Sequence, residues 1–224
     1  MNMRYLLIVV FLIITSVGAV FYFGKKDTNK IINKTAEADT TREYKIIAFG
    51  DSLTAGYGVN LNESYPAILE KYLKVINTNI KIINAGVSGE TTTGGLDRVD
   101  FIISQKPQLV LLGLGANDML RSINPDVTKT NLEKIIIALK ENDIPMVILG
   151  MKAQIGNGFA YKKKFDSIYA DLSAKYDLPL VPFFLENVIL VKDLNINDGI
   201  HPNRQGYEKI VKENVLPVLK KVID

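Results

Sequence analysis

Short apolar runs alternate with amphipathic stretches along most of the chain. The runs have the length of strands, whereas the stretches between them repeat apolar residues at helical spacing. Strands are predicted at 45–49, 80–83, 109–112, 145–149 and 180–181, and helices at 65–74, 96–105, 128–141, 165–176 and 205–222, with Pro217 as a candidate kink in the last. This alternation predicts an α/β fold with a parallel sheet covered on both faces.

Four segments rich in glycine and polar residues follow the predicted strands or precede the last helix. They are 50–56, 84–91, 113–118 and 198–203. In a parallel sheet the ligand crevice lies beyond the carboxyl ends of the strands, so we expect these segments to meet there. Together they supply a serine, an imidazole, a carboxylate and hydrogen-bond donors, which acyl transfer by a serine requires.

Each of these residues also has an ordinary structural interpretation. The turn at Ser52 could simply cap a helix, His201 could be a turn residue before Pro202, and Asp198 could cap the last helix. Asn117 could occupy a left-handed turn conformation. The co-occurrence of all four segments at one predicted edge favours the catalytic interpretation. The phosphate-loop, dinucleotide-loop and nucleophile-elbow patterns are all absent from the sequence, so these motifs do not explain the segments.

These segments resemble the four sequence blocks of the GDSL, or SGNH, hydrolase family. The blocks are Gly50-Asp51-Ser52-Leu53, Gly89, Asn117 within Gly-Ala-Asn-Asp, and Asp198-x-x-His201. Within that family the chain is similar to the bacterial arylesterases and the multifunctional thioesterases and lysophospholipases, from about residue 44 to its end. The resemblance implies a three-layer α/β/α, flavodoxin-like fold with a central parallel sheet, and it implies no metal or organic cofactor.

The resemblance also implies a role for each residue of these blocks. Ser52 would be the nucleophile, His201 the general base and acid, and Asp198 the partner of the imidazole. The oxyanion hole would comprise the backbone N–H groups of Ser52 and Gly89 and the side-chain amide of Asn117. One loop departs from the family: where such esterases tend to carry Ala-Pro-Pro-Asn after the fourth strand, this chain has the sequence Ala153-Gln154-Ile155-Gly156-Asn157-Gly158. The acyl-chain preference is therefore not predicted.

Composition and charge exclude several other kinds of site and partner. The chain has no cysteine and a single histidine, which excludes disulfides, thiolate chemistry and zinc sites built on several histidines. The net charge of +3 comes from the N-terminal residues, because Lys and Arg balance Asp and Glu over 46–224. The balanced body predicts no nucleic-acid partner.

The first 24 residues are predicted to be a signal or a membrane anchor. Residues 6–23 carry no charge and as a helix would span about 27 Å, close to the hydrocarbon thickness of a bilayer. A retained anchor helix, a cleaved export signal and a buried helix of the body are the alternatives. Arg4 before the run is typical of an export signal, whereas the basic residues after it favour a cytoplasmic body. Residues 25–44 are typical of a polar linker, and 45–224 of one esterase domain.

The predicted function is that of a serine esterase, exported to the periplasm or another extracytoplasmic site and anchored there or released. Its substrate would be a small-molecule or lipid ester, such as an aryl ester, an acyl thioester or a lysophospholipid. Two alternatives remain open: a deacetylase of cell-envelope carbohydrate that uses the same triad, and a non-catalytic flavodoxin-like ligand-binding domain. The sequence predicts no oligomeric state.

Overall fold

The computed structural model describes residues 43–75 and 79–223. The predicted apolar segment at 1–24 and nearly all of the predicted linker at 25–44 lie outside these residues, so both stay predictions. Within the described ranges, no helix combines the length and the apolar character needed to cross a membrane.

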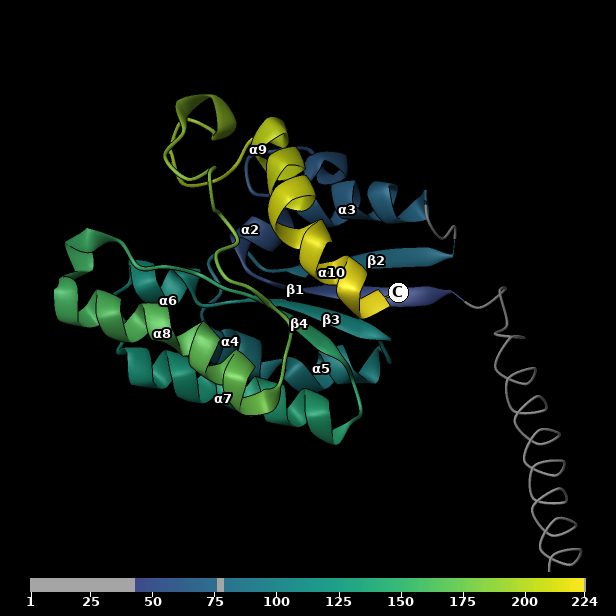
Figure 1. Ribbon diagram of the computed structural model, residues 1–224, viewed down its shortest axis with the longest axis horizontal. Coiled ribbons are helices and arrows are strands. Elements are labelled where there is room, and N and C mark those ends of the chain that lie inside the picture. The colour runs from purple at the N-terminus through teal and green to yellow at the C-terminus, as the bar shows by residue number, and fades with distance from the viewer. Residues whose placement is uncertain (1–42, 76–78, 224) are drawn as a thin grey trace, which may run out of the picture. The chain divides into compact units, whose positions relative to one another are not determined.

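A parallel sheet of five strands forms the centre of the described body (Figure 1). The strands are β1 (Tyr44–Gly50), β2 (Ile80–Gly86), β3 (Leu109–Gly113), β4 (Met146–Leu149) and β5 (Leu180–Val181), in the spatial order β2-β1-β3-β4-β5. All four neighbouring pairs are parallel, and the positions 46–49 of β1 and 109–112 of β3 are at most 1% exposed. The predicted parallel sheet is therefore confirmed, with the apolar runs at its buried centre.

Helices cover both faces of this sheet (Figure 1). Along the chain they are α2 (Ser52–Ala55), α3 (Tyr65–Lys74), α4 (Thr92–Asp97), α5 (Val99–Ser104), α6 (Ala116–Leu120), α7 (Pro125–Glu141), α8 (Phe159–Tyr176), α9 (Arg204–Lys209) and α10 (Leu216–Ile223). Helices α4, α5, α7 and α8 lie on one face, and α3, α9 and α10 lie on the other (Figure 1). The layers are thus the α/β/α arrangement that was expected.

The helix predicted at 96–105 is two helices in the structure, α4 and α5, and the first begins at Thr92. The chain leaves helical geometry at Arg98, whose φ and ψ are −115° and 11°. The Arg98 side chain donates to the carbonyl oxygens of Gly50 and Ala85 at the ends of β1 and β2. The early start and the break both follow tertiary contacts, which helical periodicity does not record.

The last helical segment continues past Pro217 without ending. Residues Ile210–Val215 between α9 and α10 form a π-helical turn with wider hydrogen-bond spacing. A proline lacks the N–H that an α-helix needs and its ring crowds the carbonyl four residues before it, here that of Glu213. The π-helical turn loosens the helix at this point, so the structure accommodates Pro217 by a local change of helix type.

Candidate active site

Ser52 is the first residue of α2, directly after the turn that follows β1. Asp51 caps this short helix, because its carboxylate accepts a hydrogen bond of 3.0 Å from the N–H of Leu53. Gly50 makes the turn possible, since a Cβ at that position would lie 2.1 Å from Oγ1 of Thr54 and 2.6 Å from the carbonyl oxygen of Gly113. The capping interpretation thus holds for Asp51, and it leaves the hydroxyl of Ser52 available for other contacts.

His201 connects Ser52 to Asp198 through its two ring nitrogens. Nε2 lies 2.8 Å from Oγ of Ser52, and Nδ1 lies 2.6 Å from Oδ2 of Asp198. When Nδ1 carries the proton and donates it to the carboxylate, Nε2 is left to accept the proton of the serine hydroxyl. The structure therefore brings together the three residues that the resemblance pairs.

Asp198 is held in place by the backbone of its own loop. Its Oδ1 accepts hydrogen bonds of 2.9 Å from the N–H groups of Ile200 and His201. Burial raises the pKa of Asp198, but the hydrogen bonds from His201 and Ile200 outweigh burial, so the pKa lies below its ordinary value. Asp198 does not cap the last helix; Asn203 does so, by accepting from the N–H of Gly206 at 3.0 Å.

Asn117 lies in the first turn of α6, directly after β3. Asn117 has helical geometry and does not occupy the left-handed conformation considered for it. The left-handed residue of this turn is Gly115, with a φ of 112°. The side chain of Asn117 is buried, and among the described residues its Nδ2 has no hydrogen-bond partner. An unpaired buried donor is costly, so this amide is suited to a ligand oxygen that enters the site.

Gly89 lies in the turn that follows β2. Its φ is 82°, in the left-handed region that favours glycine. The turn is attached to the Ser52 strand, because the N–H of Val87 donates to the carbonyl oxygen of Gly50 at 3.0 Å. The predicted oxyanion donors thus belong to turns that follow three adjacent strands, β2, β1 and β3.

A buried carboxylate that the sequence analysis did not single out fixes two of these turns to each other. Asp118 is fully buried and accepts from the N–H and the hydroxyl of Thr92 and from the hydroxyl of Thr128. It links the start of α4 to the turn that carries Asn117. Its place directly after Asn117 in the motif was the only sequence signal for this role.

An ion pair between Arg98 and Glu90 supports the same region from within. Glu90 follows Gly89, and its carboxylate accepts from Nε and Nη2 of Arg98. The guanidinium group also lies 4.5 Å from the centre of the Phe49 ring. Nothing in the sequence pairs these residues with the site, because Arg98 falls inside a stretch that has the periodicity of an ordinary helix.

Asp51 is a further buried carboxyl, directly before the candidate nucleophile. Burial raises its pKa to about 7, the hydrogen bond from Leu53 lowers it, and the nearby carboxylates Glu90 and Asp118 raise it. Its Oδ2 has no partner within the described residues. The site is thus built above a carboxyl that keeps its proton to a higher pH than an exposed aspartate does.

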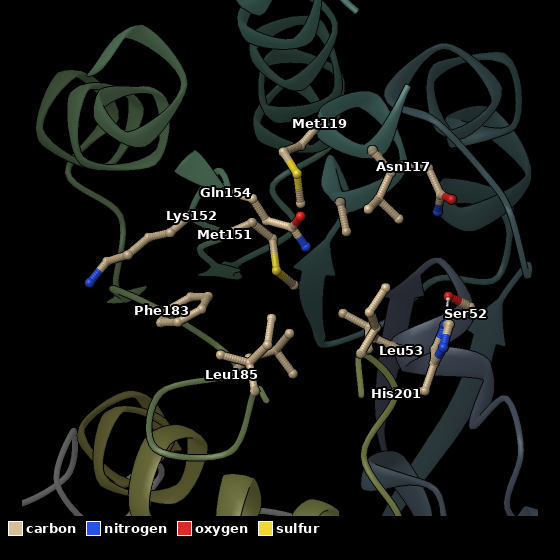
Figure 2. Close-up of a pocket in the computed structure, with 14 residues that line it drawn as sticks. Ser52, Leu53, Asn117, Met119, Met151, Lys152, Gln154, Phe183, Leu185 and His201 are labelled. Atoms are coloured by element: carbon tan, nitrogen blue, oxygen red, sulfur yellow. Dashed lines mark hydrogen bonds between the residues drawn. The ribbon is translucent and has the colours of Figure 1, made fainter. Parts of the chain in front are cut away.

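A mostly apolar pocket opens beside Ser52 and His201 (Figure 2). Its lining includes Leu53, Met119, Met151, Phe183, Leu185 and Ile189. In Figure 2 Met119, Met151, Phe183 and Leu185 lie across the pocket from Ser52 and His201, and the ammonium group of Lys152 points away from it. Such a pocket is suited to a hydrocarbon chain bound next to the hydroxyl.

The loop that departs from the family, at 153–158, meets the loop at 119–124 beside this pocket. Asn157, the asparagine displaced from its family position, donates to the carbonyl oxygen of Met119 at 2.9 Å and to the hydroxyl of Ser122 at 3.2 Å. It therefore ties the segment after β4 to the loop at 119–124.

Among the described residues, no group of three or more His, Cys, Asp or Glu side chains is placed to hold a metal ion.

Comparisons with known proteins identify the family to which the chain belongs. The family model of the GDSL-like Lipase/Acylhydrolase family matches residues 48–209. An arylesterase of Vibrio mimicus is 37% identical over 163 residues, which cover 72% of this chain and 82% of the relative. The thioesterase 1/protease 1/lysophospholipase L1 of Escherichia coli strain K12 is 34% identical over 174 residues, covering 77% and 80%.

Solved structures of esterases have the same fold. The crystal structure of TesA superposes with a TM-score of 0.76 at 32% identity, covering 80% of this chain and 99% of the other. AlinE4, an SGNH-hydrolase family esterase, superposes with a TM-score of 0.68 at 44% identity, covering 82% and 98%. The chain therefore belongs to the GDSL-like lipase/acylhydrolase family, as its sequence blocks predicted.

Proposed function

We propose that this protein is a serine esterase that hydrolyses carboxylic esters or thioesters through an acyl-enzyme on Ser52. The observation that carries this proposal is the continuous hydrogen-bonded chain from Oγ of Ser52 through His201 to Asp198. A serine hydroxyl is a weak nucleophile, and a neutral imidazole in contact with it is the group that removes its proton during attack. Family membership supports the same conclusion.

The reaction then proceeds in two steps on this geometry. As Oγ of Ser52 attacks the carbonyl carbon, Nε2 of His201 accepts the hydroxyl proton, and Asp198 stabilises the resulting imidazolium. The oxyanion is expected to face Nδ2 of Asn117 and the N–H groups of Ser52 and Gly89. The imidazolium next gives its proton to the leaving alcohol or thiol. In the second step His201 removes a proton from water, which attacks the acyl-enzyme. The imidazolium then gives this proton to Oγ of Ser52 as the acid leaves, which restores the starting state.

The apolar pocket supports an acyl chain as the group bound beside Ser52 (Figure 2). Aryl esters, acyl thioesters and lysophospholipids are the proposed substrates, since the similar proteins include an arylesterase and a thioesterase 1/protease 1/lysophospholipase L1. A carbohydrate deacetylase would need many polar side chains to bind sugar hydroxyls, whereas most of the residues that line this pocket are apolar. A domain that only binds a ligand has no need of the paired histidine and serine.

A panel of p-nitrophenyl esters and acyl thioesters of increasing chain length tests this function. The wild-type chain should hydrolyse them, and a fluorophosphonate probe should label it at Ser52. Ser52→Ala should abolish labelling and turnover, while Ser88→Ala, at an exposed serine in the neighbouring turn, should leave both unchanged. Labelling at another serine, or undiminished turnover by Ser52→Ala, would remove the assignment. Activity on acetylated glycan alone would favour the deacetylase.

We also propose that residues 6–23 direct the chain to or across a membrane and that the esterase domain acts outside the cytoplasm. The length and uncharged character of this segment support the proposal, together with Arg4 before it. Cell fractionation and the intact mass of the purified protein test it. Recovery with membranes at full mass indicates an anchor, and an extracytoplasmic form shortened at its N-terminus indicates a cleaved signal. Intact protein found wholly in the soluble cytoplasmic fraction would contradict both.

A further inference from the structure

The turn that carries Gly89 lies at the outer edge of the site. The N–H of Glu90 donates to the carbonyl oxygen of Val87 at 3.1 Å, which closes the turn. Within the described chain the N–H of Gly89 has no acceptor, so it is available to an incoming oxygen. A glycine with a positive φ has wide conformational freedom, so contacts from outside the turn help to hold the turn that carries this N–H in place.

Arg121 makes a contact of this kind. Its Nη2 donates to the carbonyl oxygen of Gly89 at 2.7 Å, across 32 positions of the sequence. Its own backbone N–H donates to the carbonyl oxygen of Asn117 at 3.1 Å, because Arg121 ends the helix α6 that begins at Ala116. Arg121 thus bonds both to the turn of Gly89 and to the first turn of α6 with Asn117. These two segments carry the proposed oxyanion donors other than the N–H of Ser52.

An oxyanion hole depends on the spacing of its donors. A donor stabilises the charge strongly only when it lies about 2.7–3.1 Å from the developing oxyanion. Gly89 and Asn117 belong to turns after different strands, β2 and β3, so their distance is set by what connects these turns. Asp118 and Thr92 connect them within the buried layer, whereas the guanidinium group of Arg121 connects them at the exposed rim.

We propose that Arg121 is a positioning residue of the oxyanion hole. It binds the carbonyl oxygen of Gly89, which belongs to the peptide after this residue, and so holds the turn that carries the Gly89 N–H in register with the amide of Asn117. This inference rests on the proposed esterase function. Arginine suits the role because its planar guanidinium group keeps a fixed direction toward a carbonyl oxygen, whereas the ammonium group of lysine is a flexible point charge. The described residues offer Arg121 no carboxylate within 4.0 Å, so its bond to Gly89 does not compete with an ion pair.

An exposed arginine beside an ester site has one other obvious use, which is to attract an anionic leaving group. The two roles differ in what they change. A residue that positions oxyanion donors acts in the transition state, so its loss lowers kcat for neutral and anionic substrates alike. A residue that binds the leaving group changes KM, and only for anionic substrates, in a way that salt screens.

The experiment compares Arg121→Ala and Arg121→Lys with Arg204→Ala in the full chain. Arg204 is the matched control, because its side chain is 64% exposed and pairs with Glu208 on α9. The substrates are neutral p-nitrophenyl butyrate and the polyanionic thioester butyryl-coenzyme A. Arg121→Ala should lower kcat by about 10–100-fold on both, with KM within about twofold. Arg121→Lys should recover part of the loss, and Arg204→Ala should behave as wild type.

A double variant tests whether Arg121 acts through the donors. If it does, Arg121→Ala should cost much less when Asn117→Ala has already disabled the hole, so the two effects on kcat will not multiply. Multiplying effects, or a rise of KM confined to butyryl-coenzyme A, would overturn the inference. A wild-type chain that hydrolyses neither substrate would instead overturn the proposed function, so the two failures are distinguishable. Equal melting temperatures of wild type and Arg121→Lys confirm that the comparison is made on folded protein.

Discussion

Nε2 of His201 lies 2.8 Å from Oγ of Ser52, although 149 positions separate the two residues in the chain. The serine is fixed by the turn between β1 and α2, and the histidine by a loop in which its carbonyl oxygen accepts from the N–H of Ile196 at 2.9 Å. The ring of Tyr57 packs against the imidazole, with the ring centres 4.8 Å apart. The contact therefore depends on both ends of the domain being folded.

The first prediction concerns the orientation of this imidazole. Asp198→Asn should lower kcat by about 10²–10⁴-fold, because an amide can donate to Nδ1 and so stabilise the ring in the wrong tautomer. KM should change little. Steady-state kinetics on a p-nitrophenyl ester measure both. The control is Asp193→Asn, at an exposed carboxylate of the same loop. Near wild-type kcat in Asp198→Asn would contradict the role of Asp198.

The second prediction concerns Asn117. Asn117→Ala should lower kcat by about 10²–10³-fold and leave KM nearly unchanged, because the amide is expected to meet a full negative charge only in the tetrahedral intermediate. Labelling of Ser52 by a fluorophosphonate should persist at a reduced rate. Asn142→Ala, at an exposed asparagine after α7, provides the control. If KM rises while kcat is kept, Asn117 orients the substrate and another donor serves the oxyanion.

The third prediction is a dependence of stability on pH that comes from Asp51. Its pKa is raised to about 7 in the folded chain, whereas an unfolded aspartate titrates near 4. Between these values the folded state keeps a proton that the unfolded chain has released. The contribution of Asp51 to the free energy of unfolding is therefore greatest below pH 4 and decreases up to pH 7, by about 4 kcal/mol at most.

Asp51→Asn should remove this decrease, because an amide does not titrate and its oxygen can still accept from the N–H of Leu53. Urea unfolding at several pH values from 4.5 to 7.5 should give the variant a growing advantage over wild type as pH rises. Asp100→Asn, at an exposed carboxyl on α5, should follow the wild-type curve. Parallel curves for wild type and Asp51→Asn would show that Asp51 titrates normally.

The fourth prediction concerns the length of the acyl chain. Met151 is buried and lines the pocket opposite Ser52, so Met151→Phe should shorten the space for hydrocarbon (Figure 2). Each methylene removed from contact costs about 0.8 kcal/mol. We expect kcat/KM to fall about 10-fold for octanoyl esters and to stay within about twofold for acetyl esters. The reverse change at an exposed position, Phe101→Met, should alter neither value. Equal losses on both esters would place the acyl chain elsewhere.

The sheet was predictable because its strands are short apolar runs bounded by glycine or polar residues. The edge that carries the site followed from the rule that parallel strands end on the same side, and the family resemblance then named Ser52, His201 and Asp198. These three residues lie together in the structure. Their catalytic roles stay predictions until variants are measured.

Contacts between distant segments account for what the sequence did not predict. The break at Arg98 depends on carbonyl oxygens of β1 and β2, and the start of α4 at Thr92 depends on Asp118. Neither Asn157 nor Arg121 lies at a position that periodicity marks, and both matter only through the loops they reach. Local patterns record which face of an element is buried, but they do not record the partner of a single polar side chain.

Gly50 and Gly86 occupy the same level of β1 and β2, and neither has room for a side chain. A Cβ on Gly86 would lie 2.2 Å from the backbone nitrogen of Ala55, as one on Gly50 would collide with Thr54. A single added methyl group would therefore push helix α2, and Ser52 with it, away from the turn that carries Gly89. In the segment after β4, by contrast, a Cβ on Gly156 would meet nothing within 4 Å. Substitutions in the pocket loops can thus change the acyl preference during evolution. The position of Ser52, in contrast, requires that residues 50 and 86 both remain glycine.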